Sequence, residues 1–254
     1  MRRKFVTPHK SMRHLPFRKS SLLQGLAIAA VADVLAIWQL QRVFQWHTRA
    51  VEAFLDWAKV PWERGREIML LPGVSASLVR TTYLNYREHP IYPWISLGAA
   101  VVLYLIGYRM WAAPIRYFLM ILPASLAVTL LYLRLVSTSV PYSPEDFCTI
   151  WYRGEAYAWL VIPWIFAVSF FTMAVPLLMK LSWMPIIFIF GFLWSAVRLS
   201  LALATFYYFG AIWMPFFYFA LGFLVDFMYV VAFYSLALDG ATTWIAQRRE
   251  VWEG

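Results

Sequence analysis

The feature that most constrains this chain is a series of apolar segments, each about as long as a helix that crosses a lipid bilayer. A hydrocarbon core of roughly 30 Å requires about 20 residues of helix. Because 62% of the residues are hydrophobic and only 14% are charged, the composition excludes a water-soluble domain. We therefore predict an all-α, polytopic membrane helix bundle of about six transmembrane helices, forming one integral domain over residues 22–238. The predicted spans are 22–44, 92–111, 115–134, 156–179, 183–209 and 213–238.

The basic N-terminal segment, residues 1–21, predicts the orientation of the bundle. It carries seven Lys and Arg residues and no acidic residue. A basic segment before an apolar helix stays on the cytoplasmic side, and we prefer this explanation to nucleic-acid binding. An even number of spans then returns the tail, residues 239–254, to the cytoplasm. We expect the inner membrane of a cell, with the mitochondrial inner membrane as the alternative, because the segment also resembles a targeting leader.

The connector at residues 45–91 is placed on the outer side by this orientation. Its stretch WHTRAVEAFLDWAKVPWERGREIMLL has apolar and aromatic residues at mixed helical spacing. Such a pattern predicts one or two amphipathic helices lying on the membrane surface. Three tryptophans would then lie at headgroup level, namely Trp46, Trp57 and Trp62.

Three ionisable residues lie deep in the predicted spans: Asp33, Arg198 and Asp226. An unpaired charge near the bilayer midplane costs several kcal/mol. The last two spans form an antiparallel hairpin that brings Arg198 and Asp226 to similar depth, so we predict that these two residues form an ion pair. Asp33 would complete a cluster of three charged residues. Two acids and one base lack one positive charge, which a proton or a partner's cation would supply. This cluster serves a proton path or an active site, or it locks the helices together.

A second group of reactive side chains surrounds Cys148 at the outer end of the fourth predicted span, in YSPEDFCTIWYRGEAYAW. An arginine close to a thiol favours the reactive thiolate, whereas a lone cysteine is commonly a small packed residue. A single cysteine excludes an intrachain disulfide and a multi-cysteine metal site. The histidines lie outside the apolar segments, and we expect neither a metal nor a cofactor. The other members of this outer-loop polar cluster are Glu145, Asp146, Arg153 and Glu155.

Residues 184–227, MPIIFIFGFLWSAVRLSLALATFYYFGAIWMPFFYFALGFLVDF, resemble the C-terminal core of the exosortase and archaeosortase family. Its members are polytopic membrane cysteine transpeptidases that cleave C-terminal sorting signals of exported proteins. The resemblance implies that Cys148 is the catalytic nucleophile and that Arg198 is the cation that binds the substrate or the transition state. Tyr218 falls near the position of the family's histidine.

Two other functions stay open. Residues 220–238, ALGFLVDFMYVVAFYSLAL, resemble part of the proton-channel subunit of rotary ATP synthases, which implies a proton-pathway subunit that uses Arg198 and Asp226. The chain also contains 14 Trp, 15 Tyr and 20 Phe, more than interfacial belts need. This excess indicates a non-catalytic integral subunit of a larger membrane complex, with membrane lipids and neighbouring membrane proteins as partners.

Overall fold

The computed structural model describes residues 19–84, 90–110, 113–136, 142–173 and 175–247. Within these ranges the chain is predominantly helical and contains one β-hairpin. The elements are α1 (Lys19–Trp57), β1 (Trp62–Leu71), β2 (Val74–Thr81), α2 (Tyr92–Met110), α3 (Ala113–Leu135), α4 (Pro144–Ser169), α5 (Leu177–Phe209), a 3-10 turn (Ala211–Trp213), α6 (Met214–Phe216), the π-helix η3 (Phe217–Leu224) and α7 (Val225–Gln247).

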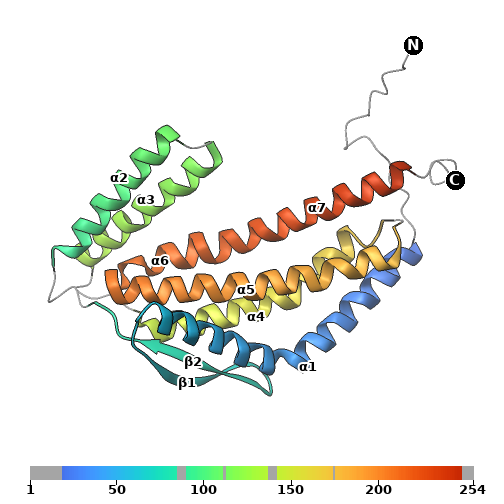
Figure 1. Ribbon diagram of the computed structural model, residues 1–254, viewed down its shortest axis with the longest axis horizontal. Helices are drawn as coiled ribbons and strands as arrows, with labels where there is room; N and C mark the ends of the chain where they lie inside the picture. The colour runs from blue at the N-terminus through green and yellow to red at the C-terminus, as the bar shows by residue number, and fades with distance from the viewer. Residues whose placement is uncertain (1–18, 85–89, 111–112, 137–141, 174, 248–254) are drawn as a thin grey trace, which may run out of the picture.

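Four long helices, α1, α4, α5 and α7, lie alongside one another and form the body of the molecule (Figure 1). The β-hairpin packs on α1 and α4. Helices α2 and α3 pair with each other and stand apart from the body, and α3 contacts α6 and the turn before it. The described start of α1 and the described end of α7 lie at the same end of the body (Figure 1).

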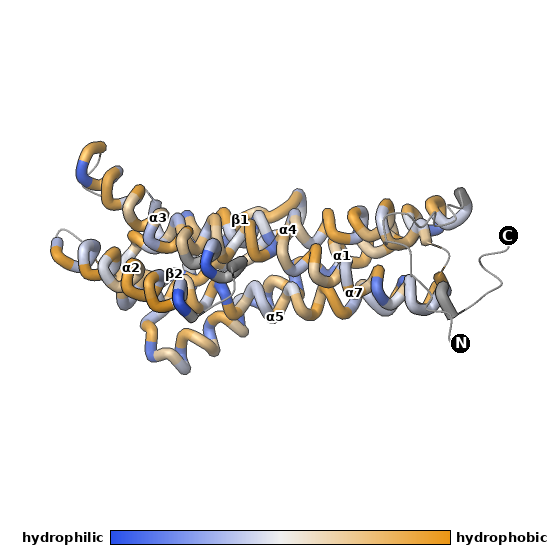
Figure 2. Tube along the Cα trace, turned by 90° about the horizontal axis from the view of Figure 1, so that it is seen from above, coloured by the Kyte–Doolittle hydropathy of each residue, from blue (hydrophilic) through white to orange (hydrophobic). Residues whose placement is uncertain are grey.

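Within the described part of the chain, three helical segments are long and apolar enough to cross a membrane: Ser20–Trp57, Leu177–Phe209 and Ala211–Trp244. The third begins with the 3-10 turn and continues without a break through α6 and η3 into α7. Hydrophobic residues recur along all the long helices (Figure 2). Helices α2 and α3 nearly coincide in sequence with the predicted spans 92–111 and 115–134, whereas α4 begins and ends about ten residues before the predicted span 156–179. That these three helices cross the membrane stays a prediction.

The connector predicted as surface helices has a different structure. Helix α1 does not end near residue 44 but continues to Trp57, and the chain then forms the antiparallel β1–β2 hairpin. The fold is therefore mainly helical rather than all-α. Pro72 and Gly73 form the hairpin turn, where Gly73 has φ +80°, a value that glycine adopts without strain. Buried and less buried side chains largely alternate along β2, as a strand with one covered face requires.

The tryptophans predicted at headgroup level differ in their surroundings. Trp46 and Trp57 are exposed on α1, whereas the indole nitrogen of Trp62 donates a hydrogen bond of 2.7 Å to Asp56. The predicted basic segment, residues 1–21, lies almost wholly outside the described residues. The predicted tail, residues 239–254, is described only as far as residue 247, where it belongs to α7.

Candidate functional site

Arg198 lies in the second half of α5 and is the largest fully buried side chain among the described residues, with 1% of its surface exposed. Its Nη2 atom donates hydrogen bonds to Asp226 and, at 2.9 Å, to Glu155. Its Nη1 atom donates to the backbone carbonyls of Leu221 and, at 3.1 Å, Gly222. The predicted buried pair between Arg198 and Asp226 is confirmed.

The two backbone acceptors of Arg198 come from the π-helix η3. In an α-helix the carbonyl of Leu221 would accept the N–H of Val225. Here the N–H of Val225 bonds the carbonyl of Gly222 instead, and the carbonyl of Leu221 accepts from Arg198. π-Helical segments within α-helices are frequent at functional sites, and this one supplies two oxygens to a buried cation.

The second carboxylate at Arg198 is Glu155 rather than the predicted Asp33. Glu155 is 3% exposed, so it also leaves the predicted outer-loop cluster. Its Oε2 atom has no hydrogen-bond partner in the described part of the chain. Asp33 is half-buried and accepts a 2.5 Å hydrogen bond from the indole of Trp164 on α4. The charge cluster is therefore Glu155, Arg198 and Asp226.

The sequence contains a signal for this position of Glu155. Cys148, Trp151, Glu155 and Trp159 recur at intervals of three or four residues and are all buried along one face of α4. Residues at this spacing share one face of a helix. A glutamate on an otherwise apolar helix face requires a buried partner, and Arg198 is the partner.

The remaining acidic residues of the predicted outer-loop cluster join α4 to the β-hairpin. Glu145 accepts the backbone N–H of Arg66 at 3.1 Å, and Asp146 lies 3.4 Å from the guanidinium of Arg66. Asp146 and Ser143 form a capping box at the start of α4. The hydroxyl of Ser143, then its backbone N–H, and then the positive charge of Arg66 lower the pKa of Asp146. This part of the cluster stabilises the start of α4.

Cys148 is fully buried, and its S–H group donates to the carbonyl of Val79 at 3.5 Å. Arg153, the arginine expected to activate this thiol, donates instead to the carbonyl of Met69 at 3.4 Å. The hydrogen bonds of Arg198 do not include Cys148. The structure therefore gives Cys148 a packed position without an activating base in hydrogen-bond contact among the described residues.

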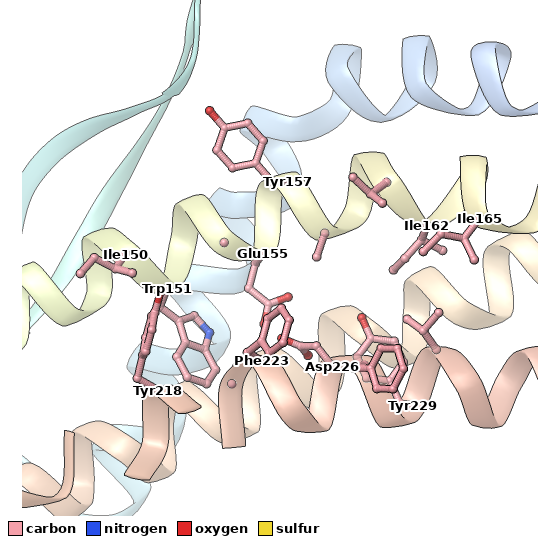
Figure 3. Close-up of a pocket in the computed structure, with 16 residues that line it drawn as sticks. Ile150, Trp151, Glu155, Tyr157, Ile162, Ile165, Tyr218, Phe223, Asp226 and Tyr229 are labelled. Carbon is pink, nitrogen blue, oxygen red and sulfur yellow. The ribbon is translucent and has the colours of Figure 1, made fainter. Parts of the chain in front are cut away.

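A groove of about 350 Å³ lies between α4 and the η3–α7 segment, beside the charge cluster. Its walls are mostly apolar and include Tyr218, the third predicted catalytic residue. Figure 3 shows Glu155, Asp226 and Tyr229 converging between the two helices. The hydroxyl of Tyr229, like Oε2 of Glu155, is buried without a hydrogen-bond partner in the described structure.

A layer of polar side chains continues from the cluster towards α1. The guanidinium of Arg198 lies 5.1 Å from the ring centroid of Trp151, within the range of a cation–π contact. The indole of Trp151 donates to the hydroxyl of Ser195 at 3.2 Å, and the same hydroxyl lies 3.2 Å from Nε2 of His47. His47 is completely buried on α1. Because we placed it in a surface helix, the sequence interpretation missed it.

Across the described ranges, no group of three or more His, Cys, Asp or Glu side chains is arranged to hold a metal ion. Comparison of the chain with protein-family models, with curated proteins and with solved structures found no match.

Proposed function

We propose that this chain is an integral membrane protein that binds and releases a proton at the Glu155–Arg198–Asp226 cluster, as part of a proton pathway. The observation that carries the proposal is that two carboxylates share one buried guanidinium. With all three groups ionised, the cluster has one net negative charge. A net charge among apolar helices is costly, and protonation of one carboxyl group removes it.

Polar groups on both sides of the cluster support proton exchange. Asp226 lines the groove and keeps 21% of its side chain exposed. On the other side, Ser195 and His47 extend the polar layer into α1. A carboxyl group at this position therefore has polar neighbours in two directions.

Infrared spectroscopy of the full-length protein in lipid nanodiscs tests this proposal. We expect a protonated-carboxyl band that disappears as the pH rises, and that is lost or shifted in Glu155→Gln and in Asp226→Asn. The exposed Glu67 of β1 provides the control variant Glu67→Gln, which should leave the band unchanged. A wild-type protein without a titrating carboxyl band, or with a band that both cluster variants leave intact, contradicts the proposal.

The exosortase-like transpeptidase hypothesis has less support from the site. A nucleophile must reach its substrate, and Cys148 is buried and bonded to a backbone carbonyl. Tyr218, which falls near the position of the family's histidine, lines the groove. The hypothesis is tested by Cys148→Ala, which must abolish the processing of sorting signals if Cys148 is the nucleophile.

A non-catalytic subunit of a larger membrane complex is the second candidate, and the α2–α3 pair favours it. This pair stands apart from the body (Figure 1) and exposes large apolar side chains, including Leu105, Ile106 and Val128. Purification in mild detergent should then recover a stoichiometric membrane partner, which is lost when Leu105 and Ile106 are both replaced by serine. Wild-type protein recovered only as a monomer would argue against this candidate.

The expected location is the inner membrane of a cell, with both termini cytoplasmic, and the mitochondrial inner membrane is the alternative. Three long apolar helices indicate a membrane protein. The side on which the termini lie follows from the basic residues near the N-terminus. Protease protection of a C-terminal tag in sealed inverted and right-side-out vesicles tests the orientation.

A further inference from the structure

The groove beside the charge cluster is open at the molecular surface, where apolar side chains line it. Its walls include Tyr157, Val161, Phe223 and Phe227, and each of these side chains is more than half exposed. In a protein that spans a membrane, such side chains face acyl chains. An amphiphilic molecule dissolved in the bilayer can therefore enter the groove sideways.

The floor of the groove has hydrogen-bond acceptors and surplus negative charge. Oε2 of Glu155 and the hydroxyl of Tyr229 are buried and have no partner within the described ranges, and Asp226 lies beside them (Figure 3). The charged group that contacts these carboxylates is Arg198 from α5. Two further titratable side chains, Tyr157 and Tyr218, line the groove, and His47 from α1 interacts electrostatically with Arg198. Arg198 neutralises one of the two carboxylates and leaves the other without a counter-charge.

We propose that the groove binds an amphiphile with a primary ammonium head and an unbranched alkyl chain, and that the ammonium head takes the place of the proton at Glu155 and Asp226. The proposal rests on the proposed proton-binding function and names a substrate class for the same site. A primary ammonium group has three N–H donors, which match the carboxylate oxygens and the Tyr229 hydroxyl. The alkyl chain lies against the apolar walls. On binding, one carboxyl O–H bond breaks and its proton leaves to water, so that charge is conserved.

The test uses the full-length protein in nanodiscs of zwitterionic lipid, with dodecylammonium as the probe and dodecanol as the uncharged competitor. We expect saturable binding whose affinity rises with pH, by about tenfold for each pH unit while the carboxyl group is protonated, and levels off once the group is ionised, because one proton exchanges for one cation. Dodecanol should compete poorly. Binding that does not depend on pH, or that dodecanol displaces as well as the amine does, overturns the proposal.

A matched pair of glycine variants tests the location. Gly154 lines the groove, and a Cβ atom added there meets no heavy atom within 4 Å. Gly98 on α2 is equally open and lies outside the groove. Gly154→Leu should fill the groove and lower the affinity by about tenfold or more, as steric exclusion from a site does, whereas Gly98→Leu should not change it. Equal affinity in the two variants contradicts the proposal.

The infrared experiment separates the two proposals. If the carboxyl band titrates and dodecylammonium neither shifts it nor releases protons, the groove proposal fails and the proton-binding function stands. If no carboxyl group titrates, the proton-binding function fails. Dodecylammonium could still bind saturably in that case. If it also does so in Glu155→Gln and Asp226→Asn, the amine binds without the cluster and the groove proposal fails too.

Discussion

The Oε1 atom of Glu155 lies 2.9 Å from Nη2 of Arg198, and the two side chains are 3% and 2% exposed. This contact joins α4 to α5, and the bond from Arg198 to Asp226 joins α7 to the same guanidinium. Three helices of the body thus share one cation. The free energy of unfolding should therefore depend on whether the charged side chains of this cluster are replaced singly or all together.

Replacement of Arg198 alone should be more damaging than removal of the whole cluster. Arg198→Met leaves two buried carboxylates without a cation and should lower the free energy of unfolding by about 3–5 kcal/mol. The triple variant Glu155→Leu, Arg198→Met, Asp226→Leu removes every charge and should recover most of this loss. Denaturant unfolding in detergent measures both effects. A triple variant no more stable than Arg198→Met would show that the cluster's bonds are needed for folding.

Cys148 should be protected from thiol reagents in the folded protein. Its side chain is fully buried, so modification requires local or global opening, and labelling by a maleimide should be about 100-fold slower than in the unfolded chain. Cys148→Ala should cost only about 1 kcal/mol, the value for loss of one small buried group. Fast labelling of the native protein would instead favour the transpeptidase hypothesis.

The capping box at the start of α4 should contribute to stability in a pH-dependent way. Ser143→Ala removes the N-cap and should cost about 0.5–2 kcal/mol, while Ser182→Ala, an exposed serine that bonds the carbonyl of Met179, should be nearly silent. The pKa of Asp146 is lowered from its ordinary value of 3.8. Its stabilisation is therefore complete above pH 3.8 and is lost as the pH falls through the lower, folded-state pKa.

Thermal unfolding between neutral and acidic pH checks this dependence. Wild-type protein should lose more stability below pH 3.8 than Asp146→Asn does, because the variant has no carboxyl group to protonate at this position. Identical pH profiles would contradict the role given to Asp146.

Gly25 should not tolerate a side chain. A Cβ atom there would lie 2.9 Å from Cβ of Phe171 and 3.0 Å from the carbonyl oxygen of Ala167, where α1 packs closely on the end of α4. Gly25→Ala should destabilise the protein by about 1–3 kcal/mol, as overpacking does. The control Gly98→Ala meets nothing within 4 Å and should be neutral or slightly stabilising in its helix. Equal stability of the two variants would show that α1 can move away from α4.

The sequence predicted the helical class and the central ion pair because both follow from the cost of placing polar groups among apolar helices. Apolar length indicated the long helices, and the isolation of Arg198 and Asp226 in apolar sequence indicated that they pair. Glu155 was assigned to the outer-loop polar cluster because Arg153 and Asp146 are near it in sequence. In the structure, the position of a side chain around the axis of α4 determines whether it is buried. Glu155 lies on the buried face of α4, whereas Arg153 is exposed.

The β-hairpin and His47 were missed for a related reason. The helices predicted for residues 45–91 rested on apolar and aromatic residues at mixed helical spacing. This prediction gave no weight to Pro72–Gly73 as a turn or to the strand-like alternation that follows it. His47 lies three residues after the buried Phe44 and four before the buried Val51, which is the spacing of one helix face. Its hydrogen bond to Ser195 depends on the packing of α1 against α5, which local sequence does not contain.

The π-helix also sets the rotational position of the last helix. Successive residues of an α-helix are about 100° apart around the axis, and a π-helical turn takes up one residue more than an α-helical turn. If the same residues, Phe217–Leu224, formed a regular α-helix, the faces of α7 would therefore be turned by about 100° relative to α5. Asp226 would no longer face Arg198, and an apolar neighbour would take its place. The π-helical segment thus determines which side chain of α7 meets the buried arginine.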